Sequence, residues 1–208
     1  FRSTSQVHGQ QPFKASPMMN FFVTSRGLGD GGNLGGLQGA DYHCQQLAAA
    51  AGSTKTFYAY LSNRPSNGTT TLHAKDRIGT GPFYNSKGVL IAKDVAELHS
   101  KPDAINKAVA LTEKGEVVSG RGDPVNMHDI LTGSDPQGMY STAGGDTTCG
   151  NWTKSGEGSA IVGHHDRIGL KATRHMISWN SSHGSRGCGQ EDLKGTGGAG
   201  LFYCFAAE

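Results

Sequence analysis

The chain has 208 residues and a net charge of +2, and 35% of its residues are hydrophobic. Glycine is frequent at 32 residues, but the glycines show no period of three, which excludes a collagen-like helix. Lys and Arg form no cluster, which argues against nucleic-acid binding, and no apolar run approaches the roughly 20 residues that span a bilayer. The length fits one large domain or two small ones, and the composition predicts short elements joined by turns and long loops.

Residues 1–20 are rich in Ser, Thr and Gln and show no periodicity. We interpret them as an N-terminal arm that is extended or disordered unless it docks. Phe1, Phe13 and the Met18-Met19 pair would give a docked arm apolar side chains to bury. No shift in composition follows, so we expect residues 21–208 to form a single domain.

The remaining elements are short. A helix over 40–51 is indicated by apolar residues at helical spacing and by Gly52 as a stop signal, and it should carry Cys44 on its buried face. A second, short helix is expected over 92–99. Runs of β-branched, aromatic and aliphatic residues predict strands at 21–25, 56–61, 88–91, 116–118, 129–131, 159–163, 175–179 and 201–205.

Four cysteines occur in this loop-rich chain, and none is part of a Cys-x-x-Cys pair. They are typical of two disulfides and of an oxidising compartment, with four reduced, buried thiols as the alternative. Three of the four, with both tryptophans, lie in the C-terminal third, which is otherwise mostly Gly, Ser, Thr and His. This composition predicts that the C-terminal third is a long loop region. Disulfides would hold the loops, and one apolar strand would end the region.

Three local motifs carry a resemblance to a known fold: Thr56-Phe57-Tyr58-Ala59-Tyr60-Leu61-Ser62, Gly133-Ser134-Asp135-Pro136-Gln137-Gly138 and Cys149-Gly150-Asn151-Trp152. Their order over residues 21 to 205 resembles the endostatin-like branch of the C-type-lectin-like superfold. The segment 22–44, which ends in Asp41-Tyr42-His43-Cys44, is similar to secreted bacterial proteins of the same superfold. The resemblance implies an α+β domain with a small mixed sheet, few helices and a long loop region. It also implies nested disulfides, Cys44 with Cys204 and Cys149 with Cys188.

Sugar-binding members of this superfold hold calcium through a Trp-Asn-Asp motif and a second, proline-containing loop. Trp179-Asn180 matches the first motif, but Ser181 replaces its acid. Asp30, Asn33 and Asp41 are a second calcium candidate, against a glycine loop that merely wraps a helix start. No cofactor is required by these patterns, and Ca²⁺ is the one they admit. The candidate ligand-binding residues are Trp179, Asn180, His183 and Arg186.

Histidines gather in the same third, as His164-His165-Asp166, His175 and His183. Such a cluster is able to bind zinc and activate water, although neighbouring histidines on a strand point apart, and hydrogen-bonded surface histidines are the alternative. Arg121-Gly122-Asp123 is the cell-adhesion tripeptide, which also arises by chance in a Gly-rich chain.

These observations favour a non-enzymatic binding module in an oxidising compartment (secreted, periplasmic or at the cell surface) that recognises a protein or glycan through disulfide-braced loops. One alternative is a structural accessory subunit of a larger assembly, docked through the N-terminal arm. A second alternative is a metal-dependent enzyme that uses the His164/His165/Asp166 region.

Overall fold

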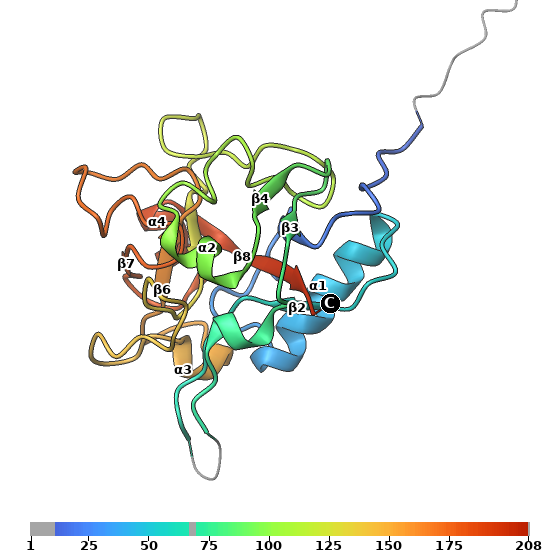
Figure 1. Cartoon of the computed structure of the whole chain (residues 1–208). Coiled ribbons are helices and arrows are strands. Elements are labelled where there is room, and N and C mark those ends of the chain that lie inside the picture. Colours follow the sequence, from blue (N-terminus) through green and yellow to red (C-terminus); the bar gives the residue numbers. More distant parts are fainter. Residues whose placement is uncertain (1–10, 67–69, 208) are drawn as a thin grey trace, which may run out of the picture.

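A computed structural model describes residues 11–66 and 70–207 of the chain (Figure 1). Its central element is β8 (Gly198–Ala206), the longest strand and almost wholly buried. A continuous apolar run of this kind is expected of a strand that is covered on both faces. The sheet has the order β1-β8-β5-β6-β7, and β2 also pairs with β8.

The strands around β8 are short. β1 (Phe21–Val23) and β2 (Phe57–Ala59) pair with β8 antiparallel, whereas β5 (Asp129–Leu131) pairs with it in parallel. β6 (Ile161–His164) and β7 (His183–Gly184) extend the sheet beyond β5. A separate two-stranded sheet consists of β3 (Phe83–Tyr84) and β4 (Leu90–Ala92).

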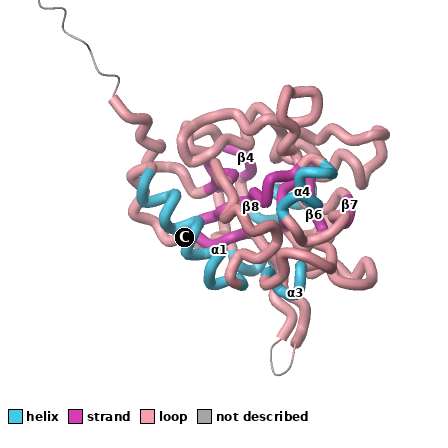
Figure 2. Tube along the Cα trace, turned by 180° about the vertical axis from the view of Figure 1, so that it is seen from behind, coloured by secondary structure: helices cyan, strands magenta, loops and turns pink. Residues whose placement is uncertain are grey.

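Side chains that alternate along β8 divide the core into two clusters. Phe202 and Cys204 pack with α1 (Gly36–Ala50) in one cluster. Tyr203 and Phe205 pack in the other, under the long loops. The loops wrap the sheet over much of its surface (Figure 2). The remaining helices are short: η1 (Ala74–Arg77), α2 (Val95–Ser100), α3 (Cys149–Trp152) and α4 (Gln190–Thr196).

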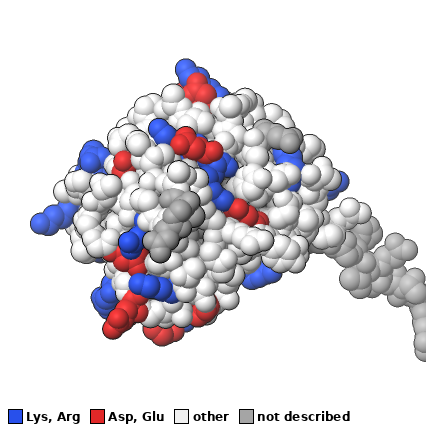
Figure 3. Space-filling view, turned by 90° about the horizontal axis from the view of Figure 1, so that it is seen from below, with Lys and Arg blue, Asp and Glu red and all other residues white. Residues whose placement is uncertain are grey.

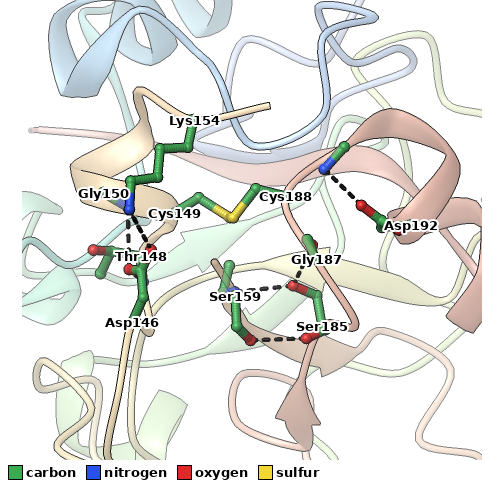
Figure 4. Close-up of a disulfide and its surroundings, with 12 residues drawn as sticks. Asp146, Thr148, Cys149, Gly150, Lys154, Ser159, Ser185, Gly187, Cys188 and Asp192 are labelled. Atoms are coloured by element: carbon green, nitrogen blue, oxygen red, sulfur yellow. Dashed lines mark hydrogen bonds and ion pairs between the residues drawn. A yellow bond between two sulfur atoms is a disulfide. The ribbon is translucent and has the colours of Figure 1, made fainter. Parts of the chain in front are cut away.

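Two disulfides join these elements in the nested order that the resemblance implies. Cys44 of α1 is bonded to Cys204 of β8, and Cys149 of α3 is bonded to Cys188. Around the inner bridge, Asp146 accepts hydrogen bonds from the Gly150 amide, and the Ser159 hydroxyl donates to the Ser185 carbonyl (Figure 4). The bridges tie the first helix to the last strand and hold the loop region together.

Residues 11–20 lie against the domain and continue directly into β1. The amide of Ala15 donates to the Ala51 carbonyl, the amide of Asn20 donates to the Tyr84 carbonyl, and the Met19 side chain is fully buried. Met18 and Phe13 stay about half exposed. Phe1 and the rest of residues 1–10 lie outside the described residues. This segment therefore uses Met19 to dock on its own domain.

Two predicted strands are wrong. Residues 116–118 make only an isolated bridge between Val117 and Leu111, and residues 175–179 form turns. In the second case the Ile177 amide donates to Thr173 and the Ser178 amide to His175, so local turn bonds replace a ladder. β3, β7, η1, α3 and α4 were not predicted. Within the described ranges, no helix is long and apolar enough to cross a membrane.

Candidate functional site

The register of three adjacent strands gathers histidines and one aspartate at an edge of the loop region. Asp129 of β5 lies directly opposite His164 of β6, and His183 of β7 lies opposite Val162, diagonal to His164. Directly opposite and diagonal residues on one sheet face are within reach of each other when their side chains are long. His128 precedes Asp129, and all four side chains converge. We call His128, Asp129, His164 and His183 the His–Asp cluster.

A glycine makes this convergence possible. A Cβ on Gly163 would lie 1.9 Å from the carbonyl oxygen of Trp179. The backbone before β7 therefore packs directly on β6, and the Ser182 amide donates to the Val162 carbonyl at 2.7 Å. This close approach brings His183 to His164.

Three imidazole nitrogens face a single carboxylate oxygen. Asp129 Oδ1 lies 3.2 Å from His128 Nε2, 3.0 Å from His164 Nε2 and 3.4 Å from His183 Nε2. The side chains of His128, Asp129 and His164 are 2–3% exposed, and that of His183 is 25% exposed. Three of the four side chains are thus buried, and the cluster reaches solvent through His183.

The opposite ring nitrogens are all held by acceptors. His164 Nδ1 donates to the Met176 carbonyl, His183 Nδ1 donates to the Gly184 carbonyl at 2.9 Å, and His128 Nδ1 donates to Asp166 Oδ1 at 3.2 Å. Burial opposes ionisation of Asp166, but hydrogen bonds from His128 and the Arg121 amide lower its pKa to about 2, so it stays an acceptor. With its proton on Nδ1, each neutral ring leaves an Nε2 lone pair close to Asp129, and the Nε2 atoms of His164 and His183 also lie 3.0 Å from each other.

This arrangement leaves lone pairs facing one another. In the described part of the chain, Asp129 Oδ1 has no hydrogen-bond donor, and it gains one only if a proton moves onto a facing Nε2. A buried carboxylate without a partner is costly, so the centre of the cluster requires a cation or a proton. Burial opposes ionisation of Asp129, yet contacts with His164 and His183 hold its pKa well below the usual range. The nearby Asp129 carboxylate favours the protonated form of His183, because protonated His183 would donate to it, and so raises the pKa of His183.

A divalent transition metal fits this ligand set. Imidazole nitrogen suits zinc, copper and nickel, whereas calcium prefers an all-oxygen shell. Zinc bonds of about 2.0–2.1 Å in a tetrahedron separate the ligand atoms by about 3.3 Å. The observed Nε2–Oδ1 separations are 3.0–3.4 Å, and the ligand atoms of His128, Asp129 and His164 all lie within 4.8 Å of one another. His183 lies outside this group of three, and the rings of His128 and His164 are stacked with centroids 3.9 Å apart. An ion held by all four groups would therefore require the imidazole rings to turn toward it.

The hydrogen-bond partners of these side chains also match those found around metal sites. Histidine ligands commonly donate their second N–H to a carboxylate or carbonyl, which fixes the ring and raises its basicity. All three rings of the cluster have such an acceptor. The second oxygen of Asp129 accepts from the Thr196 hydroxyl at 2.8 Å. Every candidate ligand is thus oriented from outside the site.

A cavity of about 330 Å³ opens beside the cluster, and His128, His164 and His183 line it. Arg121 and Arg186 also line it, so its mouth is cationic. Arg186 was predicted as a ligand-binding residue, and the structure brings it to the same cavity as His183. Trp179 and Asn180 instead line a different cavity.

The other predicted residues have separate roles. His164 and His165 point apart, since His165 Nε2 donates to the Ser119 carbonyl, and burial lowers the pKa of His165. Of the predicted His164/His165/Asp166 set, His164 therefore belongs to the cluster and Asp166 lies behind it. His175 is exposed in the neighbouring turn.

The calcium candidates have protein partners. Asp30 accepts from the Asn33 side-chain amide at 2.7 Å. Asp41 accepts from the Ala59 amide and forms a 2.7 Å ion pair with Arg77. Asn180 is 1% exposed, and its side-chain amide donates to the carbonyls of the Asp135-Pro136 turn. The oxygen atoms of Asp30 and Asp41 and the side-chain amide of Asn180 are therefore used in hydrogen bonds and an ion pair within the fold.

The cell-adhesion tripeptide forms part of a turn. Asp123 accepts from the Gly120 amide and from Lys107, and these contacts lower its pKa. The amide of Arg121 donates to Asp166 Oδ2. Arg121 and Asp123 therefore brace the loop that supports the His–Asp cluster.

Sequence reasoning missed His128 and Asp129. Residues 129–131 were predicted as a strand, but the polar role of its first residue was not. The available signal was a His-Asp dipeptide placed directly before an apolar pair, an unusual start for a buried strand. Its partners lie more than thirty residues away, and only the strand register connects them.

Comparisons with known proteins give a distant match. No protein-family model matches the chain. The human collagen alpha-1(XVIII) chain is 29% identical to it over 168 residues, which cover 76% of this chain. The match spans only 9% of the collagen chain's length. The similarity agrees with the endostatin-like resemblance in part, and the α+β architecture with few helices, small sheets and two disulfides agrees with it as well.

Proposed function

We propose that this chain is an extracytoplasmic, non-enzymatic binding module whose loop region is organised by a divalent transition-metal ion in the His–Asp cluster. The observation that carries the proposal is the convergence of three Nε2 atoms on the donorless Oδ1 of Asp129. An ion at that point would replace repulsion among lone pairs with four coordinate bonds. It would also tie β5, β6 and β7 together at the base of the loops.

The number of ligands favours a binding role. Catalytic zinc sites usually have three protein ligands and an open position for water, whereas closed sites with four protein ligands hold structure. His128, Asp129, His164 and His183 would supply four. A metal bound in this way fixes the surrounding loops, and loops on a rigid scaffold are the usual place for recognition of a protein or glycan.

The disulfide bridges support the proposed compartment. Two disulfides with no free cysteine among the described residues fit a secreted, periplasmic or surface location, because reducing compartments keep cysteine thiols reduced. The similarity to a collagen chain is compatible with a protein partner. Calcium is not favoured here, since the cluster offers three nitrogens and one oxygen.

Titration of chelator-treated protein with zinc chloride in a calorimeter tests the proposal. We expect binding at a stoichiometry of one, weakened at least about tenfold by Asp129→Asn, which keeps the shape of the side chain but removes its charge. His175→Gln is the matched control, because His175 is exposed in the neighbouring turn and lies outside the cluster. Equal affinity in all three proteins would refute the site.

The non-enzymatic part has its own test. The zinc-loaded protein is incubated with p-nitrophenyl acetate, an activated ester that zinc-bound hydroxide hydrolyses. We expect no rate above that of the chelator-treated protein, because four protein ligands leave no water on the ion. Zinc-dependent hydrolysis that Asp129→Asn abolishes would instead support the enzyme alternative.

A further inference from the structure

A second and larger cavity, of about 840 Å³, lies between α2, the Pro136-Gln137 turn and the segment 174–180. α2 and the loops beside it are visible in Figure 1. Small-molecule sites typically have volumes of about 300–1,000 Å³, so this cavity has the size of a small-molecule site. Its lining does not include any member of the His–Asp cluster.

The floor of this cavity is apolar and held rigidly. Trp179 is 4% exposed, and its ring packs 5.1 Å from the ring of Tyr60 and 5.6 Å from that of His99. His99 Nδ1 donates to the Val95 carbonyl, and its Nε2 accepts from the Tyr60 hydroxyl at 2.7 Å. Burial lowers the pKa of His99, in keeping with this neutral role. The polar groups of Tyr60 and His99 therefore satisfy one another, and the side of the cavity here is lined by Trp179 and His99.

The rim carries positive charge only. Among the described residues that line the cavity, Lys75, Lys101, Arg167 and Arg174 are cationic, and none is acidic. The whole chain is nearly balanced, with 19 basic and 17 acidic residues, and one face shows both signs interspersed (Figure 3). The cavity thus differs from that face, and its charge complements an anion.

Arg167 provides a donor that the fold leaves unused. Its Nε is buried and has no hydrogen-bond partner in the described structure. Its backbone has φ of +55°, a conformation that non-glycine residues rarely adopt, and its amide donates to the His164 carbonyl at 3.0 Å. Because Nε itself is buried, a ligand in the cavity would meet the terminal nitrogens of the guanidinium. A residue held in a rare backbone conformation at a cavity wall is a candidate for ligand binding.

We propose that this cavity binds a small amphipathic organic anion, with a carboxylate at Arg167 and Arg174 and an apolar body against Trp179. The planar guanidinium fork matches carboxylate geometry, and the aromatic floor removes apolar surface from water. This cavity is separate from the proposed metal site, so anion binding here can be tested independently of the proposed function.

Calorimetry with paired probes tests the assignment. Naphthalene-1-acetate and octanoate supply an aromatic and an aliphatic carboxylate, and each is compared with its neutral primary amide. We expect at least one carboxylate to bind with a dissociation constant of about 1 mM or tighter, and at least about tenfold more tightly than its amide. No binding by either carboxylate, or equal binding of acid and amide, would overturn the proposal.

Variants locate the site. Arg167→Gln should weaken carboxylate binding about tenfold and leave amide binding unchanged, because it removes the charge and keeps the stem. Lys171→Gln is the control, since Lys171 is exposed in the same loop but does not line the cavity. Thermal unfolding of both variants checks that the fold is intact. Trp179→Phe is a second test variant, which reduces the aromatic side chain that lines the cavity and changes no charge. Carboxylate affinity that neither Arg167→Gln nor Trp179→Phe changes would place binding elsewhere. Asp129→Asn should retain carboxylate binding, which separates this outcome from failure at the metal site.

Discussion

At the residue scale, the His–Asp cluster depends on groups behind its ligands. Each ring is oriented by a hydrogen bond from Nδ1, and Asp129 is oriented by the Thr196 hydroxyl. These contacts make the Nε2 atoms acceptors, which is the tautomer that the proposed metal would need. The cost of ordering the side chains is met by the fold before any ion binds.

Metal affinity should depend on pH. The nearby Asp129 carboxylate raises the pKa of His183 above the ordinary histidine value, so a proton must leave His183 before an ion binds there. Zinc affinity should therefore rise from about pH 5.5 to about pH 8 as that proton is lost. Calorimetry in buffers of different ionisation enthalpy would measure the released protons, and a pH-independent affinity with no proton release would contradict the cluster as the site.

In the metal-free protein, the contribution of His183 to folding stability changes with pH in the opposite direction to zinc affinity. Because the folded pKa of His183 is raised, its contact with Asp129 stabilises the fold below the ordinary histidine pKa of about 6.5. That contribution is lost as the pH rises through the folded pKa. Bound metal and bound proton thus stabilise the same cluster in different pH ranges.

The sequence revealed only part of this centre. His164 and His183 were recognised as candidates because they stand among other polar residues in the loop third. His128 and Asp129 were not, because ligands from three strands are brought together by register, and register is a long-range property. His165 shows the reverse, since period-two alternation correctly predicts that it points away from His164.

At the element scale, strong local patterns gave correct elements. The apolar run of β8 and the helical spacing that buries Cys44 in α1 were both identified from the sequence. The segment 175–179 has strand-forming residues but forms turns, because its backbone bonds locally while Trp179 packs under the second cavity. Tertiary packing overrides β propensity in such a short segment.

One glycine connects the elements of the site. Gly163→Ala would place a Cβ 1.9 Å from the Trp179 carbonyl oxygen and force β6 away from the chain before β7. We expect a loss of about 1–3 kcal/mol in unfolding free energy, together with weaker zinc binding because His164 and His183 separate. Chemical denaturation and zinc calorimetry measure the two effects.

Gly156→Ala is the control for that experiment. A Cβ on Gly156 has no atom within 4 Å, and its φ lies outside the left-handed range. It should leave stability and zinc affinity nearly unchanged. If Gly163→Ala behaved like Gly156→Ala, the close approach would not be what positions the cluster.

At the scale of the whole molecule, two disulfides link distant parts of a loop-rich chain. The disulfides close loops of 160 and 39 residues, and the chain-entropy model assigns each about 4–5 kcal/mol. The proposed metal would be a third link, at the end of the sheet formed by β5, β6 and β7. The composition already indicated a scaffold with long surface loops, but not which residues would join them.

X-ray absorption at the zinc edge of the zinc-loaded protein tests the metal centre most directly. We predict a shell of about four light ligands at about 2.0–2.1 Å, with the multiple-scattering pattern of imidazole, and loss of this signal in Asp129→Asn and His164→Gln. A shell of water oxygens, or a spectrum that these substitutions leave unchanged, would contradict a metal centre at His128, Asp129, His164 and His183.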